Sequence, residues 1–294
     1  MLDFHRKKWC LIGLIMFVVM ISGCKNRPQP KPEPPAPAIG VNVIIAEKDL
    51  LEPFRKTMEE LAKKERVRLF WEQSKGGTDQ KEKVKRLLGR KVDSMMVQFA
   101  NDQEASDLAR QAAEKDVKLL ALGLLPLGVP LEGFVGLDTQ RVGEQQGAFL
   151  AGALKELPRS RVLVFQTDPG NPAEQEILAG NLKSLGEYSQ IQVLEKPFPV
   201  EDVAASLNNI WSQVGAVEGI ITHDPQSTKE VLSSLVSQEF TPITVGLGAT
   251  RELVEIIAAG DHDAEVDLVP EIMARYAFQG ALSLARNGQW DFEK

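Results

Sequence analysis

The 294-residue sequence is poor in the residues that build covalent frameworks and metal sites. It has two cysteines, Cys10 and Cys24, and three histidines, His5, His223 and His262. This count excludes a disulfide scaffold and any zinc site that needs several thiolates. The histidines are too few and too scattered for a histidine-based metal cage. We therefore expect neither a metal nor a cofactor.

The sequence has fewer positive than negative side chains, with 34 Lys and Arg against 41 Asp and Glu and a formal net charge of −7. The first forty residues hold six Lys/Arg and two Asp/Glu, so the rest of the chain carries a net −11. A domain this acidic repels phosphate backbones, which argues against nucleic-acid binding. With 43% hydrophobic and 26% charged residues, the chain is neither disordered nor a multi-span membrane protein. Its length fits two lobes of about 100–150 residues each.

Long hydrophobic runs are missing as well. The apolar run at 9–21 is shorter than the roughly 20 residues of a membrane-spanning helix, and it follows the basic stretch Arg6-Lys7-Lys8. This order is typical of a signal peptide. The next residues, Ile21-Ser22-Gly23-Cys24, resemble the bacterial lipobox. That resemblance implies a signal peptide at 1–23 and a lipid anchor on Cys24, while an uncleaved N-terminal anchor is the alternative.

A proline-rich segment follows the lipobox. Six prolines fall within residues 28–37, a density that excludes helix and sheet and favours extended polyproline II. We interpret residues 24–40 as a tether that holds a folded domain away from a membrane. A ligand segment for SH3-type domains is the alternative, although such domains are not expected outside the cytoplasm.

From residue 41 onward, short apolar runs alternate with amphipathic helical patterns. The first half has runs at 41–46, 67–71, 94–99, 117–122 and 133–136, with helical patterns at 50–64, 81–88 and 102–114. The second half has runs at 162–165, 191–194, 217–222, 242–247 and 264–268, with helical patterns at 143–157, 173–185, 200–214, 227–237, 251–259 and 271–287. Apolar runs separated by amphipathic helices indicate a parallel sheet covered on both faces.

The alternation predicts an α/β protein with two doubly wound parallel-sheet lobes joined by a hinge. We place the N-terminal lobe at 41–140 and the C-terminal lobe at 141–268. A terminal helix at 269–294 is expected to return toward the first lobe. Because ligands of such sheets bind beyond the carboxyl ends of the strands, two facing sheets would form one cleft.

Several segments carry a resemblance to a known family. They are Glu52-Pro53-Phe54, the stretch 92–97, Val135-Gly136-Leu137-Asp138, and residues 170–175, which read Gly-Asn-Pro-Ala-Glu-Gln. In this order and spacing the chain resembles the type 1 periplasmic-binding-protein family, especially the ribose- and galactose-like solute-binding proteins of ABC transporters. The resemblance covers about residues 41–290. It implies two lobes that close about a hinge on a small solute.

The chain departs from this family where sugar binders place groups that contact hydroxyls. Gly123-Leu124 replaces a common Asp-Arg pair, Thr139 replaces Asn, and Gln175 replaces Arg. His223-Asp224 stands in place of Asn-Asp, and residues 247–249 read Leu-Gly-Ala in place of Phe-Asp-Gly. Since buried polar groups must be paired, these changes predict a pocket less charged than a pentose or hexose site. Neither ribose nor galactose is assigned.

Ten residues at or near strand ends are the predicted ligand contacts: Glu52, Phe54, Trp71, Gly123, Thr139, Gln175, His223, Asp224, Gly248 and Asp267. Each has a structural alternative. The two aromatic residues, Phe54 and Trp71, would stack on a ligand or belong to the core. His223 would contact the ligand or support its loop. Asp138 is assigned no ligand role, because it is placed to cap a helix that begins near Thr139.

These observations predict an extracytoplasmic, monomeric solute-binding protein. We expect the protein to be anchored to the membrane by lipid. It should capture a sugar or sugar-like solute by hinge closure and deliver that solute to an ABC permease. The alternative is a sensor subunit that docks on a membrane receptor without transport. An enzyme is not expected, because only His223-Asp224 suggests one and no Ser or Cys nucleophile motif accompanies it.

Overall fold

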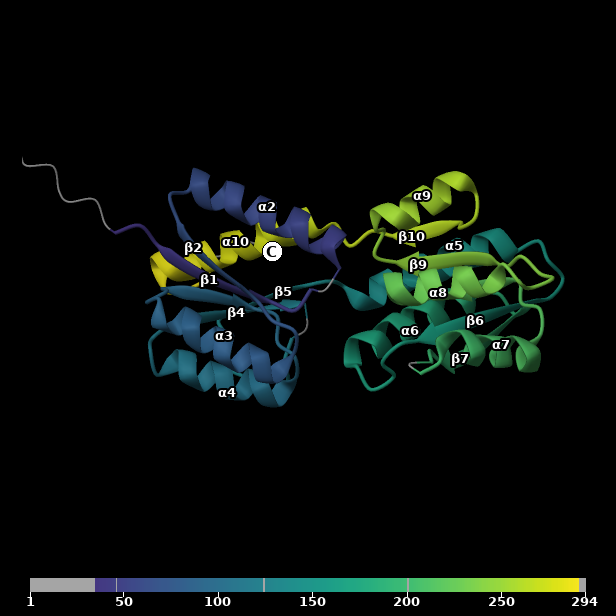
Figure 1. Cartoon of the computed structure of the whole chain (residues 1–294), viewed down its shortest axis with the longest axis horizontal. Helices are drawn as coiled ribbons and strands as arrows, with labels where there is room; N and C mark the ends of the chain where they lie inside the picture. The colour runs from purple at the N-terminus through teal and green to yellow at the C-terminus, as the bar shows by residue number, and fades with distance from the viewer. Residues whose placement is uncertain (1–34, 46, 124, 200, 291–294) are drawn as a thin grey trace, which may run out of the picture. The chain divides into compact units, whose positions relative to one another are not determined.

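The computed structural model describes residues 35–290, apart from residues 46, 124 and 200. The predicted signal peptide, Cys24 and most of the predicted tether therefore lie outside the described residues. Strands and helices alternate from Ala38 to Asn287. This part of the chain contains two α/β lobes, each built on its own parallel sheet (Figure 1). None of the helices described is both long and apolar enough to cross a membrane.

The first lobe is a five-stranded sheet with helices between its strands. Its elements are β1 (Ala38–Val43), α2 (Lys48–Lys64), β2 (Arg68–Gln73), α3 (Gly77–Gly89), β3 (Ser94–Val97), α4 (Asp102–Ala113), β4 (Lys118–Gly123) and β5 (Gly133–Gly136). The strand order is β2-β1-β3-β4-β5, and every pairing is parallel. All six residues of β1 are buried because strands flank it on both sides, whereas Arg68 and Gln73 of the edge strand β2 are exposed.

The second lobe repeats this plan. Its elements are α5 (Thr139–Leu154), β6 (Ser160–Gln166), α6 (Pro172–Leu185), β7 (Ile191–Pro197), α7 (Val203–Val214), β8 (Gly219–Ile221), α8 (Pro225–Leu235), β9 (Ile243–Leu247), α9 (Arg251–Ala259) and β10 (Ala264–Val266). The order β10-β9-β8-β6-β7 is also all parallel. In both sheets the second strand lies on one side of the first strand and the third lies on the other. This reversal opens a crevice at the carboxyl ends of β1 and β3, and of β6 and β8.

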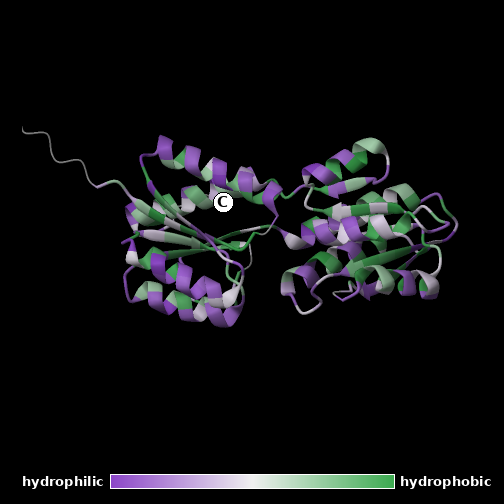
Figure 2. Cartoon of the chain, viewed as in Figure 1, coloured by the Kyte–Doolittle hydropathy of each residue, from purple (hydrophilic) through white to green (hydrophobic). Residues whose placement is uncertain are grey.

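Each sheet has an apolar cluster on both of its faces. Figure 2 shows apolar strands and hydrophilic outer helix surfaces. The last helix, α10 (Pro270–Asn287), packs on the first lobe, where Ala274 and Phe278 share a cluster with Ile39. The Ser94 hydroxyl donates to the carbonyl oxygen of Ala281 at 2.7 Å and pins α10 to β3. The chain therefore passes from the second lobe back to the first.

Helices α5 and α6 pack closely because glycine lies at their contact. A Cβ added to Gly143 of α5 would overlap the carbonyl oxygen of Ile177 in α6, and one added to Gly147 would lie 2.8 Å from Asn181 O. The four-residue spacing of these glycines predicts such a close approach, and the structure confirms it.

The predicted fold class is confirmed, while several element boundaries differ from the sequence prediction, among them the starts of β1, α5 and α7. β1 begins at Ala38, so residues 38–40 belong to the sheet and not to the tether. The Ala38 N–H donates to Asp93 Oδ2 at 2.7 Å, which fixes the start of the strand. α5 begins at Thr139, four residues before the helical pattern predicted at 143–157, with Asp138 capping it as expected through a 2.9 Å bond from Arg141 N–H to Oδ1. α7 begins at Val203 and not at residue 200.

Candidate functional site

A cavity of about 460 Å³ opens at the carboxyl ends of the strands. This volume suits a small organic molecule, because ligand pockets commonly measure roughly 300–1,000 Å³. The first lobe lines it with Val43, Ile45, Glu47, Leu50, Phe54, Gln98, Leu122, Gly123 and Leu137. The β8–α8 turn and the segment leading into α10 add Asp224, Pro225, Gln226, Leu268, Pro270 and Met273. The cavity therefore coincides with the crevice that the strand order predicts.

The first-lobe wall of the cavity is the end of that lobe's hydrophobic core. Val43, Phe54 and Leu122 are at most 2% exposed and belong to one core cluster. Ile45 packs against the same cluster. A ligand that touches this wall meets rigid apolar side chains, since core residues are held at close packing.

Gln98 is the amide on this wall, and a buried network holds it in place. Its Oε1 accepts a hydrogen bond from Ile44 N–H at 2.8 Å. Gln80 Nε2 donates to the Gln98 carbonyl oxygen and to Asn42 Oδ1, both at 2.7 Å. One acceptor site of Oε1 is therefore already engaged, while the Nε2 donor of Gln98 is available to a ligand. That nitrogen would lie 3.9 Å from a Cβ at Gly123, so the two residues sit side by side.

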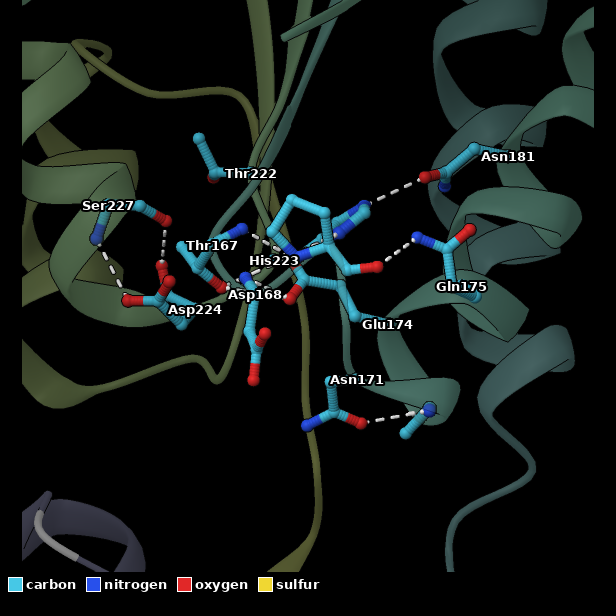
Figure 3. A network of polar contacts seen from close by, with 12 residues as sticks. Thr167, Asp168, Asn171, Glu174, Gln175, Asn181, Thr222, His223, Asp224 and Ser227 are labelled. Carbon is cyan, nitrogen blue, oxygen red and sulfur yellow. Dashed lines mark hydrogen bonds and ion pairs between the residues drawn. The ribbon is translucent and has the colours of Figure 1, made fainter. Parts of the chain in front are cut away.

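Asp224 is one of the cavity-lining residues, and Figure 3 shows it beside Ser227 at the start of α8. It caps α8, because its Oδ1 accepts from Gln226 N–H at 2.8 Å and from Ser227 N–H at 2.9 Å. Its other oxygen, Oδ2, is buried and has no hydrogen-bond partner among the residues that the structure describes. A buried carboxylate oxygen without a partner is costly, and a donor brought close to it would lower that cost.

Three of the ten predicted contacts, Phe54, Gly123 and Asp224, line this cavity. Gly123 has φ +77°, a backbone conformation that favours glycine irrespective of any ligand. Trp71 lies outside the cavity and packs on Phe54, with their ring centroids 6.1 Å apart. Glu52 is exposed and pairs with Lys48 at 3.4 Å. The core alternative describes the position of Trp71 in this structure, and Glu52 lies at the surface of α2.

Four further predicted contacts also lie outside the cavity, and contacts within the protein occupy them. The Thr139 hydroxyl donates to Glu176, and Gln175 Nε2 donates to Pro169 O at 2.7 Å. Asp267 Oδ1 accepts from Val269 N–H at 2.9 Å. Gly248 has φ +123°, and a Cβ there would lie 2.5 Å from Cγ of Pro225. The positive φ and the close contact with Pro225 therefore explain why position 248 is a glycine.

His223, the remaining predicted contact, lies in a buried polar network beneath the β6–α6 turn (Figure 3). Its Nδ1 is 3.3 Å from Glu174 Oε1, and its Nε2 is 2.9 Å from Asn181 Oδ1. The His223 and Glu174 side chains are only 1% and 8% exposed. Glu174 also accepts from the backbone N–H groups of Thr167 and Asp168. The network ties the end of β8 to α6 and to the turn, which is the loop-supporting alternative.

Two opposing effects set the pKa of Glu174. Burial favours the neutral acid, but hydrogen bonds from His223 and from the backbone N–H groups of Asp168 and Thr167 outweigh it. The pKa of Glu174 is therefore lowered from its ordinary value of 4.5. A carboxyl whose folded-state pKa is lowered stabilises the fold above the unfolded-state pKa, and this contribution is lost as the pH falls through the folded-state value.

We expect Glu174→Gln to flatten the acid limb of the stability profile. At about pH 7 the variant should be less stable than the wild type by roughly 2 kcal/mol, since a charge-assisted network is broken. Below the ordinary pKa of 4.5 this difference should shrink, because the wild type then loses the carboxylate. Urea denaturation across the pH range measures both effects. The exposed Glu239→Gln serves as control, and a constant gap between wild type and Glu174→Gln at every pH would contradict the assignment.

Several cavity residues were not among the sequence predictions. Gln98 lies inside the apolar run predicted at 94–99, and a polar residue at the carboxyl end of a buried strand was its available signal. Leu268 and Met273 come from the segment that returns to the first lobe, and nothing in their local sequence marks them as cavity residues. Among the described residues, no three His, Cys, Asp or Glu side chains gather in a way that could hold a metal ion.

Residues 39–289 match the family described as periplasmic binding protein domain. The chain belongs to this family. The resemblance noted from the sequence is thereby confirmed, and so is the prediction that the protein is not an enzyme, because periplasmic binding proteins bind solutes. Membership also gives the protein an extracytoplasmic location.

Individual relatives are distant in sequence. The D-xylose-binding periplasmic protein of Escherichia coli (strain K12) is 22% identical over 264 residues, which cover 85% of this chain and 79% of that protein. A solute-binding protein of an Actinobacillus succinogenes 130z ABC transporter, solved with D-allose, superposes with a TM-score of 0.75 at 17% identity, covering 86% and 92% of the two chains. A glucose-galactose binding protein from Geobacillus stearothermophilus gives 0.77 at 15% identity, with 88% and 93% covered. At such identities the structural matches establish the fold alone.

Proposed function

We propose that this periplasmic binding protein captures a small organic solute in the cavity lined by Phe54, Gln98 and Asp224 and delivers it to an ABC importer. The observation that carries the proposal is the cavity itself, which lies at the topological switch point of the sheet and is lined from both lobes. The named relatives support transport, since one is described as part of an ABC transporter. In this proposal the protein acts as a monomer.

Binding energy would drive the two lobes together. A ligand shifts a conformational equilibrium only by its different affinities for the two states, so contacts from both lobes are needed to favour closure. The cavity offers such contacts, because Phe54 belongs to the first lobe and Asp224 to the second. The closed form would be the one that a permease recognises.

We also propose that lipid on Cys24 holds the protein at the membrane, with the proline-rich segment as a spacer. The support is the lipobox-like sequence before Cys24, and several acyl chains on one cysteine bind a membrane durably. Cys24→Ser should move the protein from the membrane fraction to the soluble fraction, while Cys10→Ser should leave a membrane-bound chain. Equal partitioning of Cys24→Ser and wild type would refute lipid anchoring without touching solute binding.

Native mass spectrometry of freshly purified protein tests the binding role. We expect an added mass of a few hundred daltons at most, which disappears after unfolding and refolding in clean buffer. Calorimetry with the refolded protein against sugars, polyols, nucleosides and small amines should then give at least one saturable heat. A folded protein that carries no added mass and binds nothing in the panel would defeat the proposal.

Measuring solute uptake by cells distinguishes import from sensing without transport. A strain that lacks this chain should fail to accumulate the solute found above if the protein serves a permease. Unchanged uptake together with a lost transcriptional response to the same solute would favour a sensor that docks on a membrane receptor.

A further inference from the structure

We infer that the solute is an apolar molecule that carries an amino group, and not a sugar. The inference rests on the proposed solute-binding function and names the ligand class of the same cavity. It departs from the D-xylose and D-allose in the names of the relatives.

The first argument is the composition of the cavity wall. Ten of the fifteen lining residues have apolar side chains, among them Ile45, Phe54, Leu122, Leu137 and Met273, and one more is Gly123. Such a wall stabilises an apolar ligand in proportion to the area that it removes from water. A sugar brings hydroxyls on every edge of its ring, and each hydroxyl that is buried without a partner weakens binding.

The second argument concerns the polar groups from which a sugar site would be built. Thr139, Gln175 and His223 stand where sugar binders of this family place hydroxyl-binding residues. In this chain their side chains bond to Glu176, to Pro169 O and to the pair Glu174 and Asn181. None of the three lines the cavity. These three side chains bond within the protein, so the hydrogen-bonding side chains on the cavity wall are limited to Glu47, Gln98, Asp224 and Gln226.

The third argument is the sign of the charge at the cavity. The ionisable groups that line it are Glu47 and Asp224, and none of the described lining residues is Lys, Arg or His. Glu47 lies 4.0 Å from Lys229, which also pairs with Glu252 at 3.4 Å. No cation among the described residues forms an ion pair with Asp224, whose Oδ2 is buried and unpartnered. An ammonium group would bring a charge opposite to that of these two acidic residues, whereas a carboxylate ligand would be repelled.

Four small probes separate these properties: benzylamine, benzyl alcohol, benzoate and D-xylose. The three aromatic probes share one ring and differ in charge, while D-xylose replaces the apolar body by hydroxyls. With the full chain in detergent, freed of co-purified solute, calorimetry should rank benzylamine about tenfold tighter than benzyl alcohol. Benzoate and D-xylose should each bind at least about tenfold more weakly than benzyl alcohol.

Asp224→Asn tests the charge without removing the helix cap, because Asn caps helices as well as Asp does. It should weaken benzylamine about tenfold and change benzyl alcohol by less than about twofold. The matched control is Asp138→Asn, since Asp138 caps α5 in the same way, is exposed and does not line the cavity. That variant should bind all four probes like the wild type.

The outcomes separate this inference from the proposed function. If D-xylose or another sugar binds tightest, the ligand class is wrong and the solute-binding role stands. If benzylamine and benzyl alcohol bind equally tightly, or if Asp224→Asn weakens the binding of both alike, the inference that the solute carries an amino group is wrong. If no aromatic probe binds, the apolar class is also overturned. Only silence toward these probes and toward the wider panel, with no co-purified solute, counts against the proposed function.

Discussion

Replacing Leu137 by tryptophan should weaken solute binding at least a hundredfold, or by ~2.7 kcal/mol, while the protein stays folded. Leu137 lines the cavity, is half-buried and belongs to none of the apolar core clusters. The larger indole would take up part of the roughly 460 Å³ that the solute needs. The measurement is calorimetric Kd for the tightest solute of the panel, with thermal unfolding to show that the fold is intact.

Leu127→Trp is the matched control for this substitution. Leu127 lies in the β4–β5 connection, is 72% exposed and is not among the cavity-lining residues. The same change of side chain there should leave binding within about twofold of the wild type. If Leu137→Trp binds the solute as tightly as Leu127→Trp does, the solute occupies another site.

Gly143→Ala should destabilise the second lobe by about 3 kcal/mol, the upper end of the usual cost of overpacking. A Cβ at this position would overlap the carbonyl oxygen of Ile177, which is backbone and cannot rotate away. α5 and α6 would have to separate, and this would also disturb the 2.9 Å bond from Asn181 Nδ2 to Gly143 O. Urea denaturation gives the change in the free energy of unfolding, and Tm should fall by roughly 10 °C.

Gly152→Ala, on the same helix, should have the opposite sign. Gly152 is exposed, and no atom outside its own helix turn lies within 4 Å of an added Cβ. Alanine there should stabilise the protein by about 0.5–1 kcal/mol, because glycine costs conformational entropy in a helix. Equal effects of the two alanines would mean that α5 and α6 do not meet through Gly143.

The fold could be predicted because its signals are local and repeated. The run that contains β1 is apolar except for Asn42, since a central parallel strand is buried on both faces. The helices show one apolar stripe each, as α2 does with Phe54 and Met58. Ends of elements were less predictable, and β1 starts earlier because the carboxylate of Asp93, 55 residues away, bonds to its first residue.

The site could be predicted only in part, for a physical reason. The rule that ligands lie beyond strand ends located Gly123 and Asp224, but it locates loops and not side-chain partners. His223 sits at a strand end, yet Glu174 and Asn181, which come from α6, hold its ring inside the lobe. Met273 reaches the cavity because α10 returns to the first lobe, a tertiary event without a local pattern. Both effects, the hydrogen bonds that hold His223 within the lobe and the return of α10 to the first lobe, join residues far apart in the sequence, so no local pattern predicts them.

A crystal structure of the protein loaded with its co-purified solute tests the central claim most directly. We predict electron density for one small molecule between the lobes, with its apolar body against Phe54 and Leu137 and a donor group within hydrogen-bond distance of the Asp224 carboxylate. Density for the solute at a site that shares none of these residues, or an empty cavity beside a solute bound elsewhere on the chain, would contradict the account.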